Sequence, residues 1–496
     1  MKNFHRSIAL CLSALLLLGG TVGCAQDPVV QPETTESQST AVSETETVDE
    51  AEAALADIDG ADYGGGEFTV LYADETGWAY DEEVIGMANM SEAVGSGVIN
   101  DAVFERNTKF EEMCKLTFVQ IPKHFGQLQA VLTNDIAGGT KTYQFANIGM
   151  GSAAECAVAG LLHNYLDFTI DYNHPWWDQG TLGFNLDGNV MFMNGAHNLV
   201  DDDMTYVLAF NKAMTEEYQI MNPYQTVQNG DWTLDYFQSI IQSVSAENGD
   251  GKWGLEDTYG FAASHVIGNT VFYGAGLQYI KTQPSTGEIS LALDKAGLEK
   301  ATNVLERMLT MIYDEHAIYM GSSSEFDNAA TLFIGEQAMF FSENAYYLRS
   351  IASTMEADFG IVPVPKYDAN QENYHTWAHS IGSTLCLPVS FEDTEMLAKI
   401  VETYVILSYQ HVTPAYYETL LGSRNVRDPE SAEILADILA NRTYDMSQYY
   451  RTFNLADLFY NCVNNNQTGF VSSYERTARG FERNLDQIMK KLNADK

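Results

Sequence analysis

The sequence predicts an α/β protein with mainly parallel sheets flanked by helices, and three observations support this. The chain has 496 residues, 45% of them hydrophobic, so it can bury a large core. Between residues 67 and 150, segments with strand character alternate with segments of helical periodicity. Strands that alternate with helices form parallel sheets through crossover connections. No internal repeat is visible, so a repeat architecture is not expected.

The first strand and helix of this unit are read from local pattern. Glu67–Ala73 alternates apolar and polar residues and is rich in β-formers, which predicts a strand. Asn100–Asp101 can cap a helix that follows. Val103, Phe110 and Met113 would share one face of that helix.

The unit continues with a second strand, a helix and a third strand. The second strand is expected over residues 116–121, where Pro122 would end it. Apolar residues between Leu128 and Ile136 follow helical spacing, and Gly138–Gly139 would end that helix. Residues 143–150 predict the third strand. Ligands of such sheets bind beyond the carboxyl ends of the strands, which directs attention to the loops at those ends.

The N-terminus has the pattern of an export signal, and we expect residues 1–23 to be a lipoprotein signal peptide. Two basic residues, Lys2 and Arg6, precede an apolar run over residues 8–18 that is too short to span a bilayer. Residues 21–24 resemble a bacterial lipobox, in which Cys24 is lipidated. Thr21 stands where leucine is usual, and ordinary cleavage nearby is the alternative.

Residues 24–65 are expected to form a disordered acidic tether. The stretch from Asp27 to Asp62 contains 11 acidic residues and no Lys or Arg, so self-repulsion favours an extended chain. Such a tether would hold the folded body close to a membrane surface.

The overall charge excludes some partners. The chain carries 26 basic and 68 acidic residues, a net charge of −42. Nucleic acid is therefore not an expected partner, because phosphate binding needs a basic face. Contact with a membrane is expected through the lipid anchor only.

Four cysteines remain after the signal and the anchor are set aside: Cys114, Cys156, Cys386 and Cys462. Their wide spacing matches no zinc pattern. Buried free thiols are expected, with one or two disulfides as the alternative outside the cytosol.

Nine short blocks follow one another along the chain: Asn100–Asn107, His174–Trp177, Phe210–Lys212, Asn222–Tyr224, Asp231–Thr233, Gly249–Lys252, Asp257–Gly260, Phe333–Met339 and Asp358–Lys366. In sequence and in order they resemble the lipid-anchored, sugar-type extracellular solute-binding proteins of ABC transporters found in gut Firmicutes. The resemblance implies a two-lobed fold like that of periplasmic binding proteins, with a hinge between the lobes. It also implies that solute binds in the cleft between them.

The resemblance further implies how the chain is divided between the lobes. Lobe 1 is expected over residues 66–200, with a return segment over 340–390. Lobe 2 is expected over residues 201–335, with a helical C-terminal part over 391–496. A closing amphipathic helix is expected from Glu475 to the C-terminus.

Candidate solute contacts in the first lobe follow the first and third strands. Trp78 and Tyr80 come directly after the first strand, and Gly151 and Ser152 follow the third. Aromatic rings suit the flat apolar faces of sugars, and glycine permits close approach of the backbone. Surface or core packing of the two aromatic residues is the alternative.

The remaining candidates come from segments whose order matches the family's second lobe and hinge. His265 and Asn269 lie in one segment, Glu343 and Asn344 follow a strand that resembles a hinge crossing, and Trp377 could stack on a sugar. His375 and His379 flank Trp377. A buried histidine or a loop packed on the lobe is the alternative reading of these positions. Trp176–Trp177 is expected to be structural.

No cofactor is expected. Asn248, Asp250 and Asp257 could be read as ligands of an EF-hand-like Ca²⁺ loop, but Ala246 occupies the first position, where a carboxylate is needed. Motifs of common hydrolases and nucleotide-binding enzymes are absent from the sequence.

The expected function is that of a lipid-anchored receptor on the extracellular face of the cell membrane. It would capture a small solute, expected to be a carbohydrate, and deliver it unchanged to the permease subunits of an ABC importer. A secreted lipoprotein enzyme acting on glycans is the main alternative, and an adhesion or scaffold lipoprotein is a third.

Overall fold

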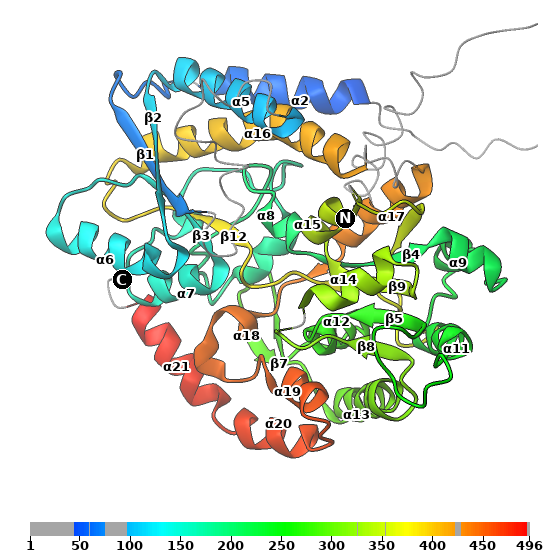
Figure 1. The fold of residues 1–496 in the computed structure, drawn as a ribbon. Helices are drawn as coiled ribbons and strands as arrows, with labels where there is room; N and C mark the ends of the chain where they lie inside the picture. The colour runs from blue at the N-terminus through cyan, green and yellow to red at the C-terminus, as the bar shows by residue number, and fades with distance from the viewer. Residues whose placement is uncertain are drawn as a thin grey trace, which may run out of the picture.

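The computed structural model describes residues 44–58, 60–74, 97–324, 326–352, 354–421 and 428–493. Within these ranges, two sheets covered by helices form two lobes that lie next to each other (Figure 1). Trp78 and Tyr80, the signal segment and Cys24 lie outside the described residues.

The first lobe is built on a four-stranded sheet in the order β12–β3–β1–β2. Its strands are β1 (Glu67–Ala73), β2 (Thr117–Lys123), β3 (Phe145–Gly149) and β12 (Ser383–Cys386). β1 is parallel to β2 and β3, and β12 is antiparallel to β3. The strand, helix and strand pattern predicted for residues 67–150 is confirmed, and β1 has the bounds that were predicted for it.

Helices cover both faces of this sheet because its strands are apolar on both sides. Phe68 and Val70 pack with α5 (Val98–Cys114) and α16 (Thr394–Leu421), whereas Leu71 packs with α6 (Leu128–Gly138) and α7 (Met150–Val158). α16 runs beside α5 along the outside of the lobe (Figure 1).

Three local predictions in this lobe are wrong. α5 begins at Val98 with Gly97 as its N-cap, so Asn100–Asp101 does not cap it, and Met113 is exposed. Pro122 does not end the second strand, since β2 continues to Lys123. β2 is an edge strand, and proline is tolerated there because one side of the strand has no ladder to donate to.

The expected disorder of residues 24–65 is also corrected in part. Residues 44–57 form a helix, α2 (Glu44–Asp57), which packs against α16 (Figure 1). Ala51 is fully buried, Leu55 packs against the same apolar cluster, and Glu50 accepts a 2.9 Å hydrogen bond from His174 Nδ1. A few apolar residues at helical spacing therefore outweigh the charge repulsion on which the prediction rested.

The second lobe is built on a five-stranded mixed sheet in the order β10–β4–β9–β5–β8. Its strands are β4 (Tyr206–Asn211), β5 (Tyr259–Ala263), β8 (Ile318–Met320), β9 (Ala338–Asn344) and β10 (Phe359–Val362). β5 is parallel to β8 and β9, whereas β4 is antiparallel to β9 and β10. All residues of β4, β5 and β10 are buried, so this sheet forms the centre of the lobe.

The helices of the second lobe follow its strands in the chain. They are α9 (Lys212–Glu217), α10 (Pro223–Gln228), α11 (Leu234–Val244), α12 (Ile267–Gly274), α13 (Lys295–Leu309), α14 (Phe326–Ile334), α15 (Ala345–Ala352) and α17 (Pro429–Ala440). A π-helical turn over Thr310–Asp314 follows α13. Two small sheets complete the set, β6 (Ile280–Thr282) with β7 (Ile289–Leu291) and β11 (Thr376–Trp377) with β13 (Arg442–Thr443).

The strand order bears on the expected lobe boundaries. β10 and most of β9 fall within the segment 340–390 that was expected to return to lobe 1, yet both strands belong to the second sheet. Within that segment, β12 is the strand that joins the first sheet. The boundaries of the lobes themselves stay a prediction.

The C-terminal part of the chain packs against both lobes. α18 (Met446–Tyr449) contacts α7 and β6, and α19 (Leu458–Asn464) contacts α12 and α13. The predicted closing helix is two helices, α20 (Phe470–Ala478) and α21 (Phe481–Leu492), because Arg479 and Gly480 separate them. Phe481, Ile488 and Leu492 of α21 are buried, as their spacing predicts.

A close approach between α11 and β5 depends on a glycine. A Cβ at Gly260 would lie 2.2 Å from the backbone oxygen of Ile241 and 2.3 Å from its Cα. Because backbone cannot give way as a flexible side chain can, Gly260→Ala is expected to destabilise the protein by about 1–3 kcal/mol. Chemical denaturation measures this, with Gly254→Ala, where a Cβ meets nothing within 4 Å, as the control. Equal stability of the two variants would contradict the packing described.

Candidate functional site

Two chain segments cross side by side where the lobes meet. Thr205 and Ala378 form an antiparallel bridge, and the His379 N–H donates to the Met204 carbonyl over 3.1 Å. The Thr376 hydroxyl also donates to the backbone oxygen of Tyr206. These bonds bring the start of β4 and the end of β11 together, beside the carboxyl ends of β5 and β9.

Glu343 lies near the end of β9 and is 1% exposed. Burial raises its pKa to about 7, and the hydroxyl of Ser264, the backbone N–H of Asn344 and the hydroxyl of Tyr206 act in the opposite direction. The Asn344 N–H donates to Glu343 Oε1 over 3.1 Å. A buried carboxyl that titrates near neutral pH is typical of a functional position.

An aromatic group stands next to this carboxyl. Trp377 is 2% exposed and stacks on Tyr206 with ring centroids 4.9 Å apart and planes 17° apart. Tyr273 and His379 also face Trp377, at 6.2 Å and 4.6 Å. The Trp377 faces are therefore packed by protein, and its Nε1 finds no hydrogen-bond partner among the described residues. No face of the Trp377 ring is left open for a solute, so the predicted stacking role gains no support.

His265 and Asn269 lie directly after β5 and at the start of α12. His265 Nδ1, Asn269 Oδ1 and Thr270 Oγ1 are buried and find no partner among the described residues. Burial lowers the pKa of His265, and burial with Arg451 and His265 nearby lowers that of His379 to about 4. Both imidazoles are thus neutral at pH 7. Buried polar atoms normally have a partner, so these atoms are suited to hydrogen bonds with a bound molecule.

The first lobe reaches the same region through the junction of β3 and α7. The Gly151 N–H donates to the Ser380 carbonyl over 3.3 Å, and the Met150 N–H donates to the Gly382 carbonyl over 3.0 Å. Gly151 and Ser152 are part-buried in the first turn of α7. The structure thus brings these two candidates next to the segment that carries Trp377 and His379.

Asn344 also has a structural role. Its Oδ1 accepts the backbone N–H of Tyr347 over 3.0 Å at the start of α15. Asn344 therefore supports the turn that follows Glu343. Whether any of the candidates contacts solute stays a prediction.

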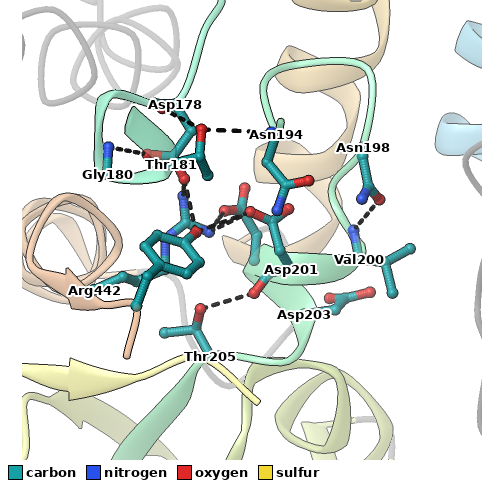
Figure 2. Close-up of polar contacts among 12 residues, drawn as sticks. Asp178, Gly180, Thr181, Asn194, Asn198, Val200, Asp201, Asp203, Thr205 and Arg442 are labelled. Carbon is teal, nitrogen blue, oxygen red and sulfur yellow. Dashed lines mark hydrogen bonds and ion pairs between the residues drawn. The ribbon is translucent and has the colours of Figure 1, made fainter. Parts of the chain in front are cut away.

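A buried cluster of charges beside the crossing segments was not predicted. Arg442 of β13 extends between Asp178 and the short helix α8 (Val200–Asp203), as Figure 2 shows. Its Nη2 lies 2.7 Å from Asp178 Oδ2, and its Nη1 lies 3.1 Å from Asp201 Oδ2 and also contacts Asp202. The Tyr444 hydroxyl donates to Asp178 and Asp201 over 2.7 and 3.1 Å.

The electrostatics of this cluster are dominated by burial. Burial raises the pKa of Asp201 well above its usual range, although Arg442 opposes this, and raises that of Asp202 as well. Burial also opposes the charge of Arg442, but Tyr444 and the three carboxylates hold its pKa well above the ordinary value. The run Asp201–Asp203 between apolar residues was the sequence signal for this cluster.

The other predicted features have structural roles. Trp176 and Trp177 are buried, and a Cβ at Gly195 would lie 2.4 Å from the Trp176 carbonyl oxygen, which confirms their packing role. Cys114, Cys156, Cys386 and Cys462 are buried free thiols, as expected.

The loop read as EF-hand-like is closed by its own hydrogen bonds. Asp257 is 1% exposed, and its two oxygens accept the N–H groups of Asn248 and Gly254 over 2.9 and 2.6 Å. Asp250 Oδ1 accepts the Lys252 N–H over 2.8 Å. In the part of the chain that the structure describes, no group of three or more His, Cys, Asp or Glu side chains is arranged to hold a metal ion.

The same ranges contain no helix that is both long and apolar enough to cross a membrane.

Solved structures share this architecture, which is the two-lobed fold of periplasmic binding proteins. The maltose/maltodextrin-binding domain MalE of Bdellovibrio bacteriovorus, bound to maltotriose, is 13% identical, with 84% of this chain and 100% of that chain covered and a TM-score of 0.50. The cyclic α-maltosyl-1,6-maltose-binding protein of Arthrobacter globiformis is 12% identical, with coverage of 87% and 99% and a TM-score of 0.54. UgpB of Mycobacterium tuberculosis, in complex with glycerophosphocholine, is 12% identical, with coverage of 86% and 99% and a TM-score of 0.53.

The fold and the polar residues where its lobes meet define a binding protein with two lobes. The model of the bacterial extracellular solute-binding protein family matches residues 94–390, and the chain belongs to that family. A search of curated proteins finds no significant match.

Proposed function

We propose that the protein is the lipid-anchored receptor of an ABC importer and captures a carbohydrate between its lobes for delivery to the permease. The observation that carries this proposal is a chain of contacts at the crossing segments: Glu343 faces Ser264 and Tyr206, and Tyr206 stacks on Trp377. His265 and Asn269 follow Ser264 in the chain and have polar atoms without a partner among the described residues. Carboxylate, imidazole and amide groups are what the hydroxyls of a sugar require as hydrogen-bond partners.

Two further findings support the carbohydrate. The first two of the structural relatives described above were solved with maltotriose or are named for binding a cyclic maltose-based sugar. Family membership supports a role in solute uptake outside the cytoplasm. The signal and lipobox patterns at residues 1–24 support the anchor.

Binding is tested by the melting temperature of the protein with a sugar panel that includes maltotriose. A solute that binds only the native state is expected to stabilise it by about 2.7 kcal/mol at 100 times its Kd, seen as a rise of a few degrees. Asn269→Ala is expected to remove most of the shift, whereas Asn370→Ala, at an exposed turn, is expected to keep it. A panel of sugars, peptides and polyamines that gives no shift would contradict solute capture.

The same samples separate a receptor from an enzyme. A receptor returns the sugar unchanged, which chromatography of the bound fraction checks. Turnover of a glycan by the purified protein would instead favour the alternative of a secreted glycan-degrading lipoprotein.

A further inference from the structure

The buried carboxylate of Glu343 is surrounded by neutral groups. Tyr206 faces it from β4, Ser264 faces it from the end of β5, and the Asn344 N–H donates to it within its own strand. Among the residues that the structure describes, no Lys, Arg or His forms an ion pair with Glu343, and none shifts its pKa.

The nearest titratable side chains do not supply a positive charge either. His265 and His379 are neutral at pH 7 because burial lowers the pKa of each. Arg451 acts on His379, but its own guanidinium is half-exposed and lies 2.5 Å from Asp457.

Other buried carboxylates in the molecule are better compensated. Asp201 and Asp202 face Arg442, Asp257 accepts two backbone N–H groups, and Asp445 accepts the N–H groups of Tyr279 and Ser447 over 2.6 and 2.9 Å. Glu343 accepts one backbone N–H. Ser264, which faces Glu343, is followed in the chain by His265 and, in the first turn of α12, by Asn269, whose polar atoms find no partner among the described residues. The segment that faces this poorly compensated carboxylate therefore also offers hydrogen bonds to a bound molecule.

Burying a carboxylate without a nearby cation costs free energy. A ligand that brings a positive charge to the carboxylate removes that cost. An anionic solute would be repelled by Glu343 and would find no basic partner among the groups described above.

We propose that the solute is an amino sugar whose protonated amine binds the Glu343 carboxylate, with its hydroxyls on the neutral side chains nearby. This inference rests on the proposed function and narrows it. Glu343 is then the residue that determines specificity between amino, neutral and acidic sugars.

The test uses sugars in three matched forms, each with a free amine, an N-acetyl amide or a hydroxyl at the same carbon. Glucosamine, N-acetylglucosamine and glucose, together with their β-1,4-linked trimers and the galactose series, are titrated calorimetrically into the mature protein. The amine form is expected to bind at least about tenfold more tightly than its two partners, the effect of one close charge pair.

Glu343→Gln is expected to remove this preference, so that the amine form binds no more tightly than the hydroxyl form. Glu288→Gln, on an exposed loop of the second lobe, is the matched control and is expected to keep the preference. A hydroxyl or N-acetyl form that binds as tightly as the amine would overturn the amino-sugar assignment and leave the carbohydrate receptor standing. Binding of no sugar in any form would overturn both.

A measurement on the unchanged protein covers the case in which Glu343→Gln fails to fold. Amine binding favours the ionised carboxyl, so affinity for the amine form should rise between about pH 5 and 6.5, where the sugar amine itself stays protonated, and binding in this range should release protons. The charged and titratable groups that face this region are Tyr206, His265, His379 and Arg451. Calorimetry in two buffers of different ionisation enthalpy detects the released protons. Proton uptake, or an affinity that does not change with pH, would contradict the proposal.

Discussion

Replacing Arg442 with methionine is expected to destabilise the protein by about 3–5 kcal/mol, the cost of breaking a buried ion pair by removing one partner. The guanidinium side chain is 9% exposed and contacts three carboxylates that come from Asp178, Asp201 and Asp202. Methionine fills a similar volume but leaves those carboxylates buried without a cation. The loss therefore comes mainly from uncompensated charge and not from a cavity.

The same variant should respond to pH in a definite direction. Without Arg442, Asp201 and Asp202 have folded-state pKa values that are raised further above those of the unfolded chain, because the group that opposed burial is gone. A carboxyl with a raised native pKa keeps its proton at low pH, so its cost appears only as pH rises. The variant should therefore be closer to wild type at pH 5 than at pH 8.

Denaturation in guanidinium chloride at the two pH values measures both effects. Arg479→Met, at an exposed position after α20, is the control and is expected to change stability by less than about 0.5 kcal/mol. If Arg442→Met were as stable as this control, the cluster would not hold the crossing segments together as described.

The position of Arg442 also connects the two parts of the candidate site. β13 pairs with β11, which carries Trp377, while Asp201 and Asp202 lie in α8 shortly before β4 and Tyr206. A single side chain thus fixes both segments that cross between the lobes. Loss of affinity in Arg442→Met would accordingly reflect misplacement of Tyr206 and Trp377, without any direct contact between Arg442 and solute.

Features with a local cause could be predicted from the sequence. The bounds of β1 follow from its own alternation, and α6 ends at Gly138 with Gly139 in the left-handed conformation that glycine adopts easily. The prediction failed at Pro122, because local pattern does not reveal which strand lies at the edge of a sheet. It also failed at α2, whose formation depends on contacts with α16, more than 300 residues further along the chain.

The same distinction between local and long-range causes applies to the candidate site. His265, Asn269 and Glu343 were selected because their segments match the order of a known family. Glu343 faces Ser264, the residue before His265, and a role of the three residues in solute binding stays a prediction. The Arg442 cluster was missed because its members are separated by up to 264 residues, and no local pattern links Asp178 to Arg442. Conversely, Trp377 has the right residue type, but its ring faces are used by Tyr206 and its neighbours, which only the packing reveals.

In the absence of solute, Glu343→Gln is expected to make the protein more stable than wild type at alkaline pH. Burial raises the pKa of Glu343 to about 7 from an ordinary value of 4.5, so the native state holds a proton that the unfolded chain has released. The stabilising effect of this proton is fully present below the ordinary pKa of 4.5 and is lost as the pH rises towards 7. Above pH 7 the carboxyl is ionised in the native state, and its burial destabilises that state in full. Glutamine resembles the protonated form at every pH.

The stability difference between Glu343→Gln and wild type should therefore widen by roughly 2 to 3 kcal/mol between pH 5 and pH 8. Urea denaturation across this range measures it, with Glu288→Gln as the exposed control whose difference from wild type should stay constant. A stability difference that does not change with pH would mean that Glu343 is ionised throughout this range and that its charge is already compensated by protein groups in the absence of solute. That outcome would also remove the reason for a cationic solute, because the missing positive charge would then be supplied by the protein itself.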